Sequence, residues 1–375
     1  MKPWLIVAGD LTPLGGMDVA NHALAKHLAS GGAEVHLVTH RAWPDLVEMS
    51  GVSLHSVWRP LRSHFLGGPL LARAGVREWR HLSARDACAV VNGGNCRIPG
   101  ANWVHYLHAA YEPETIHRRV KATVARRVDL ENERQALQEA RVVICNSRRT
   151  RNDVAERLGV SDSRLEVIYY GSDPLRFPPV TSDERTSARA ALGANGRPLV
   201  GFVGALGDRR KGFDVLFSAW LNLCARSDWD ADLVVVGSGR ERQLWEARAR
   251  EARIDRRMHF LGFRTDVPAI LAALDVLVHP ARYEAYGLSV HEAICRGVPA
   301  IVSASAGVAE KYPSELGELL IEDPNRPEEV VERLLIWRRN LERYRTMATP
   351  LSSAFRARTW DAMAAEIVSR VERAA

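Results

Sequence analysis

The sequence predicts an α/β protein built from two doubly wound domains, each with a parallel sheet covered by helices. Short apolar runs alternate with segments of helical period along the chain, which is typical of parallel strands joined by crossover helices. The chain has 375 residues, which is too long for one compact core and suits two domains. We expect domains over residues 1–175 and 196–359, with a linker rich in turn residues from 171 to 195.

The first half contains six short runs that we expect to form strands. They cover residues 4–8, 34–39, 89–92, 103–107, 142–145 and 166–169. Between the first two, residues 17–30 carry apolar side chains at helical spacing and end at Gly31-Gly32, so a helix is expected there.

The second half repeats this pattern. Expected strands cover residues 199–203, 232–236, 259–261, 276–279, 300–303 and 319–321, and expected helices cover residues 213–226, 240–251 and 288–296. Near the C-terminus, Met363, Ile367 and Val371 lie four residues apart, which predicts a helix over 360–373.

Composition narrows the function classes. The net charge is +6, and both halves carry only a small excess of basic residues, so no nucleic-acid partner is expected. The five cysteines are scattered and form no C-x-x-C pair, and the N-terminal apolar stretch is too short for a secretory signal, so we expect a cytoplasmic protein. Residues 117–127 hold five basic side chains and no acid, which indicates either a solvated helix face or contact with an anionic acceptor or the inner face of a membrane.

The most informative stretch covers residues 279–299, where a strand, a glycine turn and a helix follow one another. Glu284 and Glu292 have seven residues between them, including Tyr286-Gly287-Leu288-Ser289. A glycine turn that opens a helix directs free backbone N–H groups at one spot, which favours a phosphate. Because carboxylates repel phosphate, we expect Glu284 and Glu292 to bind neutral groups such as sugar hydroxyls.

This stretch resembles the E-x7-E signature of retaining glycosyltransferases of family 4, which have the GT-B fold. Residues 284–288 match the E-x-x-G-L element of that family, and residues 292–299 match its E-A-x-x-x-G-x-P element. The resemblance implies two Rossmann-like domains facing across a cleft, with the helix at 360–375 completing the first. It also implies transfer of a sugar, with retention at the anomeric carbon, from a UDP- or GDP-sugar to a glycan, lipid-linked or small-molecule acceptor.

Three adjacent cations form a second motif. Arg209, Arg210 and Lys211 precede an expected helix, and together they can neutralise a diphosphate. The family has an arginine where this chain has Ala205, and whether Arg209 or Arg210 replaces it stays open. The resemblance implies further donor contacts from residues at the ends of the second domain's strands, namely Gly204, Gly237, Phe263 and Arg264.

In the first domain, Gly15 and Gly16 follow the first strand and match the first glycine loop of the family, with Asp18 in its acidic position. The resemblance places His108 near the anomeric carbon of the donor sugar. A histidine at a strand end is also often only a hydrogen-bonding core residue, and this alternative is stronger for His105.

The implied mechanism uses no cofactor and no metal ion. Lys211, an arginine and the amides of Gly287, Leu288 and Ser289 would stabilise the leaving diphosphate. Glu284 would hold donor hydroxyls and Glu292 the ribose diol, and the leaving phosphate oxygen would take the acceptor proton. Glu284, His108 and Lys211 are therefore the predicted catalytic residues, and the acceptor is assigned to loops expected at 58–82 and 109–119.

Other function classes remain. A nucleotide-sugar epimerase or a phosphorylase would share the nucleotide site, and the substitution at Ala205 keeps a non-catalytic nucleotide-sugar binder open. An NAD-dependent oxidoreductase is disfavoured because the chain lacks the G-x-G-x-x-G fingerprint.

Overall fold

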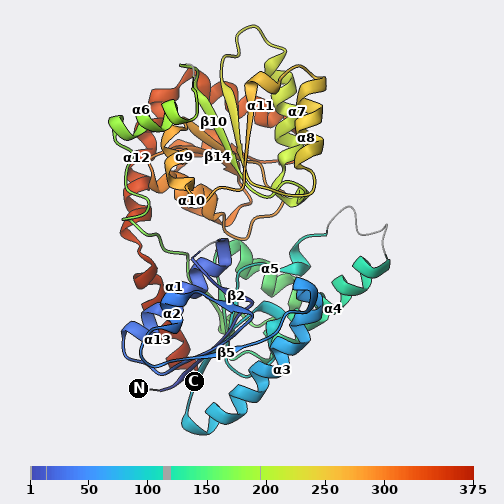
Figure 1. The fold of residues 1–375 in the computed structure, drawn as a ribbon, viewed down its shortest axis with the longest axis vertical. Coiled ribbons are helices and arrows are strands. Elements are labelled where there is room, and N and C mark those ends of the chain that lie inside the picture. The colour runs from blue at the N-terminus through green and yellow to red at the C-terminus, as the bar shows by residue number, and fades with distance from the viewer. Residues whose placement is uncertain (1, 14, 113–119, 195) are drawn as a thin grey trace. The chain divides into compact units, whose positions relative to one another are not determined.

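The computed structural model describes residues 2–13, 15–112, 120–194 and 196–375 (Figure 1). The chain divides into two units. The first consists of the N-terminal part of the chain up to Gly171 together with the C-terminal segment Thr359–Ala375, and the second is Ser172–Arg358. Each unit has its own parallel sheet with helices on both faces, so the predicted pair of Rossmann-like α/β domains is confirmed.

The first sheet has seven parallel strands in the order β5-β3-β1-β6-β7-β8-β9. Their bounds are β1 (Trp4–Val7), β3 (Val35–Thr39), β5 (Val52–Ser56), β6 (Cys88–Asn92), β7 (Ala101–Val104), β8 (Val142–Cys145) and β9 (Leu165–Val167). A separate short pair, β2 (Asp10–Leu11) and β4 (Arg41–Ala42), continues beyond β1 and β3. Strand β5 was not predicted, because its residues VSLHS are half polar and largely exposed at the edge of the sheet.

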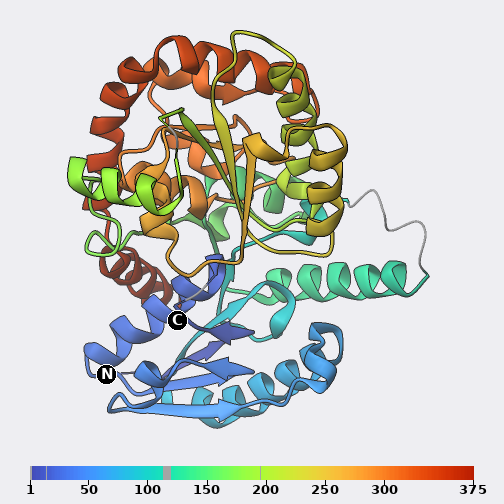
Figure 2. The same cartoon turned by 45° about the horizontal axis from the view of Figure 1, so that its top comes forward.

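The helices of the first unit are α1 (Gly16–Ser30), α2 (Pro44–Val47), α3 (His64–Leu82), α4 (Val120–Glu139), α5 (Arg148–Leu158) and α13 (Trp360–Ala374). Helix α13, from the far end of the chain, packs against α1, as Figure 2 shows. It buries Met363, Ile367 and Val371, the three residues whose spacing predicted it.

The loop predicted at 58–82 is wrong over most of its length, because residues 64–82 form α3. Pro69 and the pair Gly67-Gly68 lie inside this helix, and their low helix propensity hid it. Tertiary packing overrides that propensity: a Cβ added to Gly75 would lie 3.1 Å from the side chain of Val7 in β1 and 2.7 Å from Cys96 Sγ, so the helix packs very close to the sheet. Residues 113–119 of the other predicted loop, 109–119, lie outside the described residues. The same holds for residues 117–119 of the basic stretch, 117–127.

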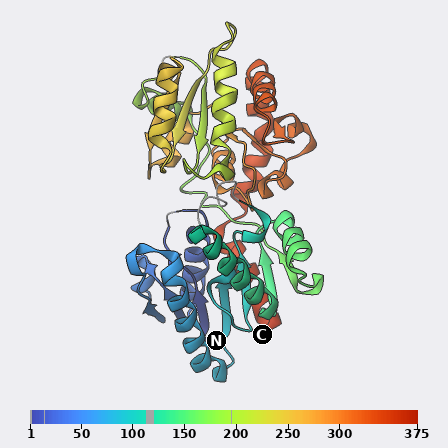
Figure 3. The ribbon, with the colours of Figure 1, turned by 90° about the vertical axis from the view of Figure 1, so that its right-hand side faces the viewer.

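The second sheet has six parallel strands in the order β12-β11-β10-β13-β14-β15. They are β10 (Leu199–Val203), β11 (Asp232–Val236), β12 (Met258–Gly262), β13 (Val276–His279), β14 (Ala300–Ser303) and β15 (Leu320–Ile321), and all six were predicted. The helices are α6 (Ser182–Ala191), α7 (Phe213–Cys224), α8 (Arg242–Glu251), α9 (Val267–Ala273), α10 (Leu288–Cys295), α11 (Pro327–Arg339) and α12 (Leu341–Ala357). Helices α7, α8 and α11 cover one face of this sheet, and α6, α9, α10 and α12 cover the other (Figures 1 and 3).

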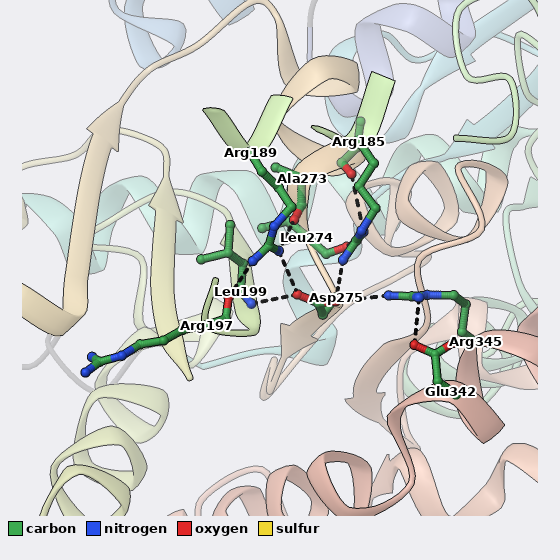
Figure 4. A network of polar contacts seen from close by, with 10 residues as sticks. Arg185, Arg189, Arg197, Leu199, Ala273, Leu274, Asp275, Glu342 and Arg345 are labelled. Carbon is green, nitrogen blue, oxygen red and sulfur yellow. Dashed lines mark hydrogen bonds and ion pairs between the residues drawn. The ribbon is translucent and has the colours of Figure 1, made fainter. Parts of the chain in front are cut away.

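The stretch predicted as a linker contains α6 and is part of the second unit. The prediction missed this helix because it has no fully buried residue and is held by ion pairs instead of an apolar face. Arg185 and Arg189 of α6 both bind Asp275, which precedes β13, and Arg345 of α12 binds it from another side (Figure 4). Among the described residues, no helix is long and apolar enough to span a bilayer.

Candidate functional site

The centre of the candidate site is a buried carboxylate in the second unit, at the carboxyl ends of β10 and β13. Glu284 accepts a hydrogen bond of 2.5 Å from Lys211 Nζ and one of 2.9 Å from His279 Nε2. The side chain of Glu284 is 11% exposed and that of His279 is fully buried. Two predicted residues, Glu284 and Lys211, are thus brought together, whereas His279 was not predicted.

The charges of this cluster are fixed by its contacts. Burial acts to raise the pKa of Glu284, but the Lys211 ammonium and the His279 hydrogen bond outweigh it and hold the pKa well below its usual range. Burial lowers the pKa of His279, so its imidazole is neutral. Because a carboxylate only accepts hydrogen bonds, Nε2 of His279 carries the proton. The cluster is therefore a carboxylate between an ammonium and a neutral imidazole.

Arg282 holds the loop that carries Lys211 in place, although no role was predicted for it. Its guanidinium makes two hydrogen bonds of 2.8 Å to the carboxylate of Asp214 and one of 2.6 Å to the backbone oxygen of Arg209. Gly212 packs so closely on the next loop that an added Cβ would lie 1.8 Å from the oxygen of Pro280. The backbone around Lys211 therefore tolerates no bulkier residue at position 212.

The other two predicted phosphate ligands are each paired with an aspartate in this structure. Arg209 lies 3.6 Å from Asp214, and Arg210 lies 3.1 Å from Asp208. Whether either of them takes the place of the arginine missing at Ala205 stays a prediction.

The amino end of α10 lies beside this cluster. Gly287 precedes the helix with a φ of 113°, a conformation that favours glycine, and no side chain of the described residues caps the helix. The loop before it is pinned by hydrogen bonds from Gly307 N to Glu284 O and from Val308 N to Tyr286 O. The predicted amides of Leu288 and Ser289 thus stand at an uncapped helix end that suits an anion. Tyr286 is buried and its hydroxyl contacts His291 at 2.7 Å, so its side chain is enclosed by the protein.

Glu292 lies one turn further along α10. Burial raises its pKa to about 7, while the charge of Arg176 acts weakly in the opposite direction. The described contacts include no hydrogen bond to its carboxylate. A group that donates to Glu292, such as a ribose hydroxyl, would favour its ionised form.

Replacing Glu292 by glutamine should stabilise the second unit at alkaline pH. The pKa of Glu292 in the folded state lies above its usual 4.5, so the folded state binds the proton more tightly and stability falls as pH rises from about 4.5 to about 7. Glutamine carries no such cost, and after allowance for partial exposure we expect a gain of about 2 kcal/mol at pH 8 and almost none at pH 4. Urea unfolding of both proteins across this range checks it, and a pH-independent difference would contradict it.

The remaining predicted donor residues lie at the ends of neighbouring strands. A Cβ on Gly237 would lie 1.9 Å from the oxygen of Gly204, so the loops after β10 and β11 meet backbone to backbone. Phe263, after β12, is 68% exposed and free to pack on a ligand. Arg264 is instead bound to Asp266 by hydrogen bonds of 2.7 and 2.5 Å.

The prediction of a metal-free site neglected a D-x-D pattern, of the kind metal-dependent transferases use, at Asp228, Asp230 and Asp232. Each of these aspartates is paired with an arginine: Asp228 with Arg226 at 2.8 Å, Asp230 with Arg338 at 2.6 Å and Asp232 with Arg257 at 2.9 Å. Asp232 begins β11, so the pattern lies at the amino end of that strand, whereas ligands bind at the carboxyl ends. It therefore adds no metal ligand beside Glu284.

In the first unit, His108 is held by a buried glutamate that the sequence did not point to. Glu133 accepts from His108 Nδ1 at 3.0 Å and from the backbone N–H groups of His108 and Ala109. Burial acts to lower the pKa of His108, but Glu133 and the charge of Asp129 raise it overall. His108 is 43% exposed and so remains open to a ligand, and its contact with the donor sugar stays a prediction.

His105 is a hydrogen-bonding core residue, as the alternative interpretation had it. Its ring contacts the hydroxyl of Tyr170 and lies 3.3 Å from Asn21 Oδ1. Burial lowers its pKa to about 3, which keeps it neutral.

Gly15 precedes α1 with a φ of 93°, and Gly16 begins that helix. Beside this turn the first unit contains a cavity of about 890 Å³. Residues from several elements line it, among them Asp10, Asp18, Asn92, His108 and Glu133. Gly15 and Gly16 are not among its lining residues, whereas Asp18 is.

Comparisons with known proteins match both halves of the chain to glycosyltransferases. A family model described as "Glycosyltransferase Family 4" matches residues 14–176, and one described as "Glycosyl transferases group 1" matches residues 197–339. The chain is 29% identical over 351 residues to the 2-deoxystreptamine N-acetyl-D-glucosaminyltransferase of Streptomyces fradiae, covering 83% of this chain and 80% of that protein.

Two further glycosyltransferases are similar to this chain, one in sequence and one in fold. The 2-deoxystreptamine glucosyltransferase of Streptomyces kanamyceticus is 30% identical over 237 residues, and the match spans 61% of this chain but only 60% of that protein. The crystal structure of WaaG, a glycosyltransferase involved in lipopolysaccharide biosynthesis, superimposes with a TM-score of 0.78 at 21% identity, over 98% of this chain and 99% of that one. This last likeness shows the fold alone.

Proposed function

We infer that this chain, a glycosyltransferase of the GT-B fold, transfers a sugar from a nucleotide diphosphate sugar to an acceptor with retention at the anomeric carbon. The donor is a UDP- or GDP-sugar, and the acceptor is a glycan, a lipid-linked saccharide or a small molecule. The observation that carries the proposal is the contact of Lys211 with Glu284 beside the uncapped amino end of α10.

The leaving diphosphate would lie at the amino end of α10. Negative charge develops on it as the glycosidic bond breaks, and the amides of Leu288 and Ser289 are aimed at that charge. An ammonium has three N–H donors, so Lys211 can keep its contact with Glu284 and still donate to a phosphate oxygen. Arg209 or Arg210 would add a second cation if it left its aspartate.

Glu284 would bind the sugar. Its carboxylate is ionised and fixed by two donors, which leaves lone pairs that can accept from sugar hydroxyls and favour the positive charge of the transition state. We propose that the acceptor attacks from the side of the departing diphosphate, whose oxygen takes the acceptor proton. No covalent sugar–Glu284 intermediate is then needed.

We propose that the reaction needs no metal ion, because Lys211 and the α10 amides supply positive charge where a metal would. A cytoplasmic location and peripheral contact with a membrane also stay proposals. The exposed side chains of Trp58, Leu61 and Phe65, which are 74%, 90% and 50% accessible, support the membrane contact.

The proposal is tested with a panel of UDP- and GDP-sugars, in the presence of EDTA, against sugar and aminocyclitol acceptors. We expect one donor class to raise the unfolding temperature, since a ligand at 100 times its Kd adds about 2.7 kcal/mol. An α-linked donor should give an α-linked product by NMR. A β-linked product would contradict retention, loss of activity in EDTA would contradict metal independence, and an epimerised donor without acceptor would indicate an epimerase.

A further inference from the structure

The cavity of the first unit is acidic, although the protein as a whole is basic. Four carboxylates line it: Asp10, Asp18, Asp129 and Glu133. Arg97 is the one arginine or lysine among the lining residues, whereas the chain carries a net charge of +6. The acids come from separate places in the sequence, since Asp10 and Asp18 flank the glycine turn and the other two lie one helical turn apart on α4.

Two of these carboxylates have no partner within the described parts of the chain. Glu133 is satisfied by His108 and two backbone N–H groups, and Asp10 lies 3.4 Å from Arg59. Asp18 and Asp129, by contrast, form no hydrogen bond or ion pair with any described residue. Burial raises the pKa of both, to about 7 for Asp18, and the neighbouring charge of Asp10 or Glu133 adds to this, whereas Arg41 and Arg59 act to lower the pKa of Asp18 and His108 acts to lower that of Asp129. A cation bound beside these two carboxyl groups would favour their ionised forms.

A side-chain amide of the cavity, that of Asn92, also has an acceptor oxygen without a hydrogen-bond donor among the described residues. Asn92, at the carboxyl end of β6, lines the cavity and is only 7% exposed. Its Nδ2 donates to the oxygen of Trp103, which fixes the orientation of the amide, and its Oδ1 has no partner among the described residues. Asp10 Oδ1 is likewise buried without a partner. Leaving a buried acceptor unpaired costs about 1–3 kcal/mol, which a donor on a ligand would recover.

The groups without a partner share one chemistry, because all of them can accept hydrogen bonds and two are carboxyl groups whose ionised form a cation would favour. A metal ion fits less well: among the described residues, the only group of three close metal-ligating side chains is His36, His55 and Glu78, none of which lines the cavity. Phe65, Leu66 and Met17 contribute an apolar wall that suits the C–H face of a ring. The volume of about 890 Å³ is that of a small-molecule site.

We propose that this cavity is the acceptor site and that it selects a small polyhydroxylated ring carrying at least one ammonium group, with Asp18 and Asp129 as counter-ions and Asn92 as a further acceptor. This inference rests on the proposed function, since it names the acceptor of that transfer. An ammonium offers three N–H donors and one positive charge, which matches what the cavity lacks.

The test uses a diaminocyclitol and its di-N-acetyl derivative, which differ in charge but not in ring. Calorimetry with the wild-type protein should show at least about 10-fold tighter binding of the diamine, the difference expected for a desolvated charge pair. Asp18→Asn and Asp129→Asn should each remove most of that preference. Asp86→Asn is the matched control, because Asp86 lies in the same unit with a side chain that is 75% exposed.

Hydrolysis of the donor sugar by water, measured in the same proteins, separates this inference from the proposed function. If donor hydrolysis is intact and the two cyclitols bind equally, or neither binds, the acceptor assignment is overturned while the transferase assignment stands. Equal weakening of both cyclitols in Asp18→Asn and Asp129→Asn would also overturn it. If no donor binds or is hydrolysed, the proposed function itself fails.

Discussion

Replacing Glu284 by glutamine should lower kcat/KM for sugar transfer about 100- to 1000-fold, because a preorganised charge at the reacting sugar contributes about 3–4 kcal/mol to lowering the barrier. Glutamine has nearly the same shape as glutamate, and its amide oxygen can still accept hydrogen bonds from Lys211 and His279. What is lost is the negative charge that faces the developing positive charge of the sugar. Initial-rate kinetics with the best donor from the panel measures the effect.

Two comparisons make this result specific. Glu251→Gln, at an exposed position on α8 of the same unit, should leave kcat/KM unchanged. The substitution also removes the counter-ion of Lys211 and should lower the unfolding temperature, so the rates are compared well below that temperature. Wild-type transfer rates in Glu284→Gln would remove Glu284 from the reaction.

Replacing Asp275 by asparagine should lower the free energy of unfolding of the second unit by about 3–5 kcal/mol, as expected when one member of a buried ion network is removed. Asp275 is 6% exposed and binds three arginines, Arg185, Arg189 and Arg345, as Figure 4 shows. It also accepts from the backbone N–H of Leu199 at 2.8 Å, so it joins α6, α12 and the start of β10.

Urea unfolding measures this change, with Asp228→Asn as the matched control. Asp228 also binds an arginine, at 2.8 Å, but its side chain is 59% exposed, so Asp228→Asn should change the free energy of unfolding far less than Asp275→Asn does. Because Asp275 lies at the amino end of β13 and Glu284 beyond its carboxyl end, donor affinity should be unchanged in Asp275→Asn at low temperature. Equal stability of the two variants would contradict the role given to the arginine cluster.

Most of the fold followed from the sequence because buried parallel strands leave continuous apolar runs. The exceptions have physical reasons. Strand β5 lies at an exposed edge, and α6 is held by Asp275 through charges. Helix α3 contains Pro69 and three glycines, yet it is fixed by the close approach of one of them, Gly75, to the sheet.

The candidate site was predictable where its residues follow a glycine turn or a strand end, as Glu284, Lys211 and Gly287 do. Their contacts were not, because β10 and β13 are neighbours in the sheet but are separated by more than 70 residues of sequence. His279, as a polar residue ending an apolar strand five positions before Glu284, was the partner most open to prediction. Glu133 gave no such signal, since it lies 25 residues from His108 in a helix rich in charged residues.

A crystal structure of the protein with its nucleotide diphosphate sugar tests the central claim most directly. The account predicts the diphosphate at the amino end of α10, within hydrogen-bonding distance of Lys211 and the amides of Leu288 and Ser289, with Glu284 accepting from the sugar. A donor bound elsewhere, with Glu284 still closed by Lys211 and no ligand beside it, would contradict the account.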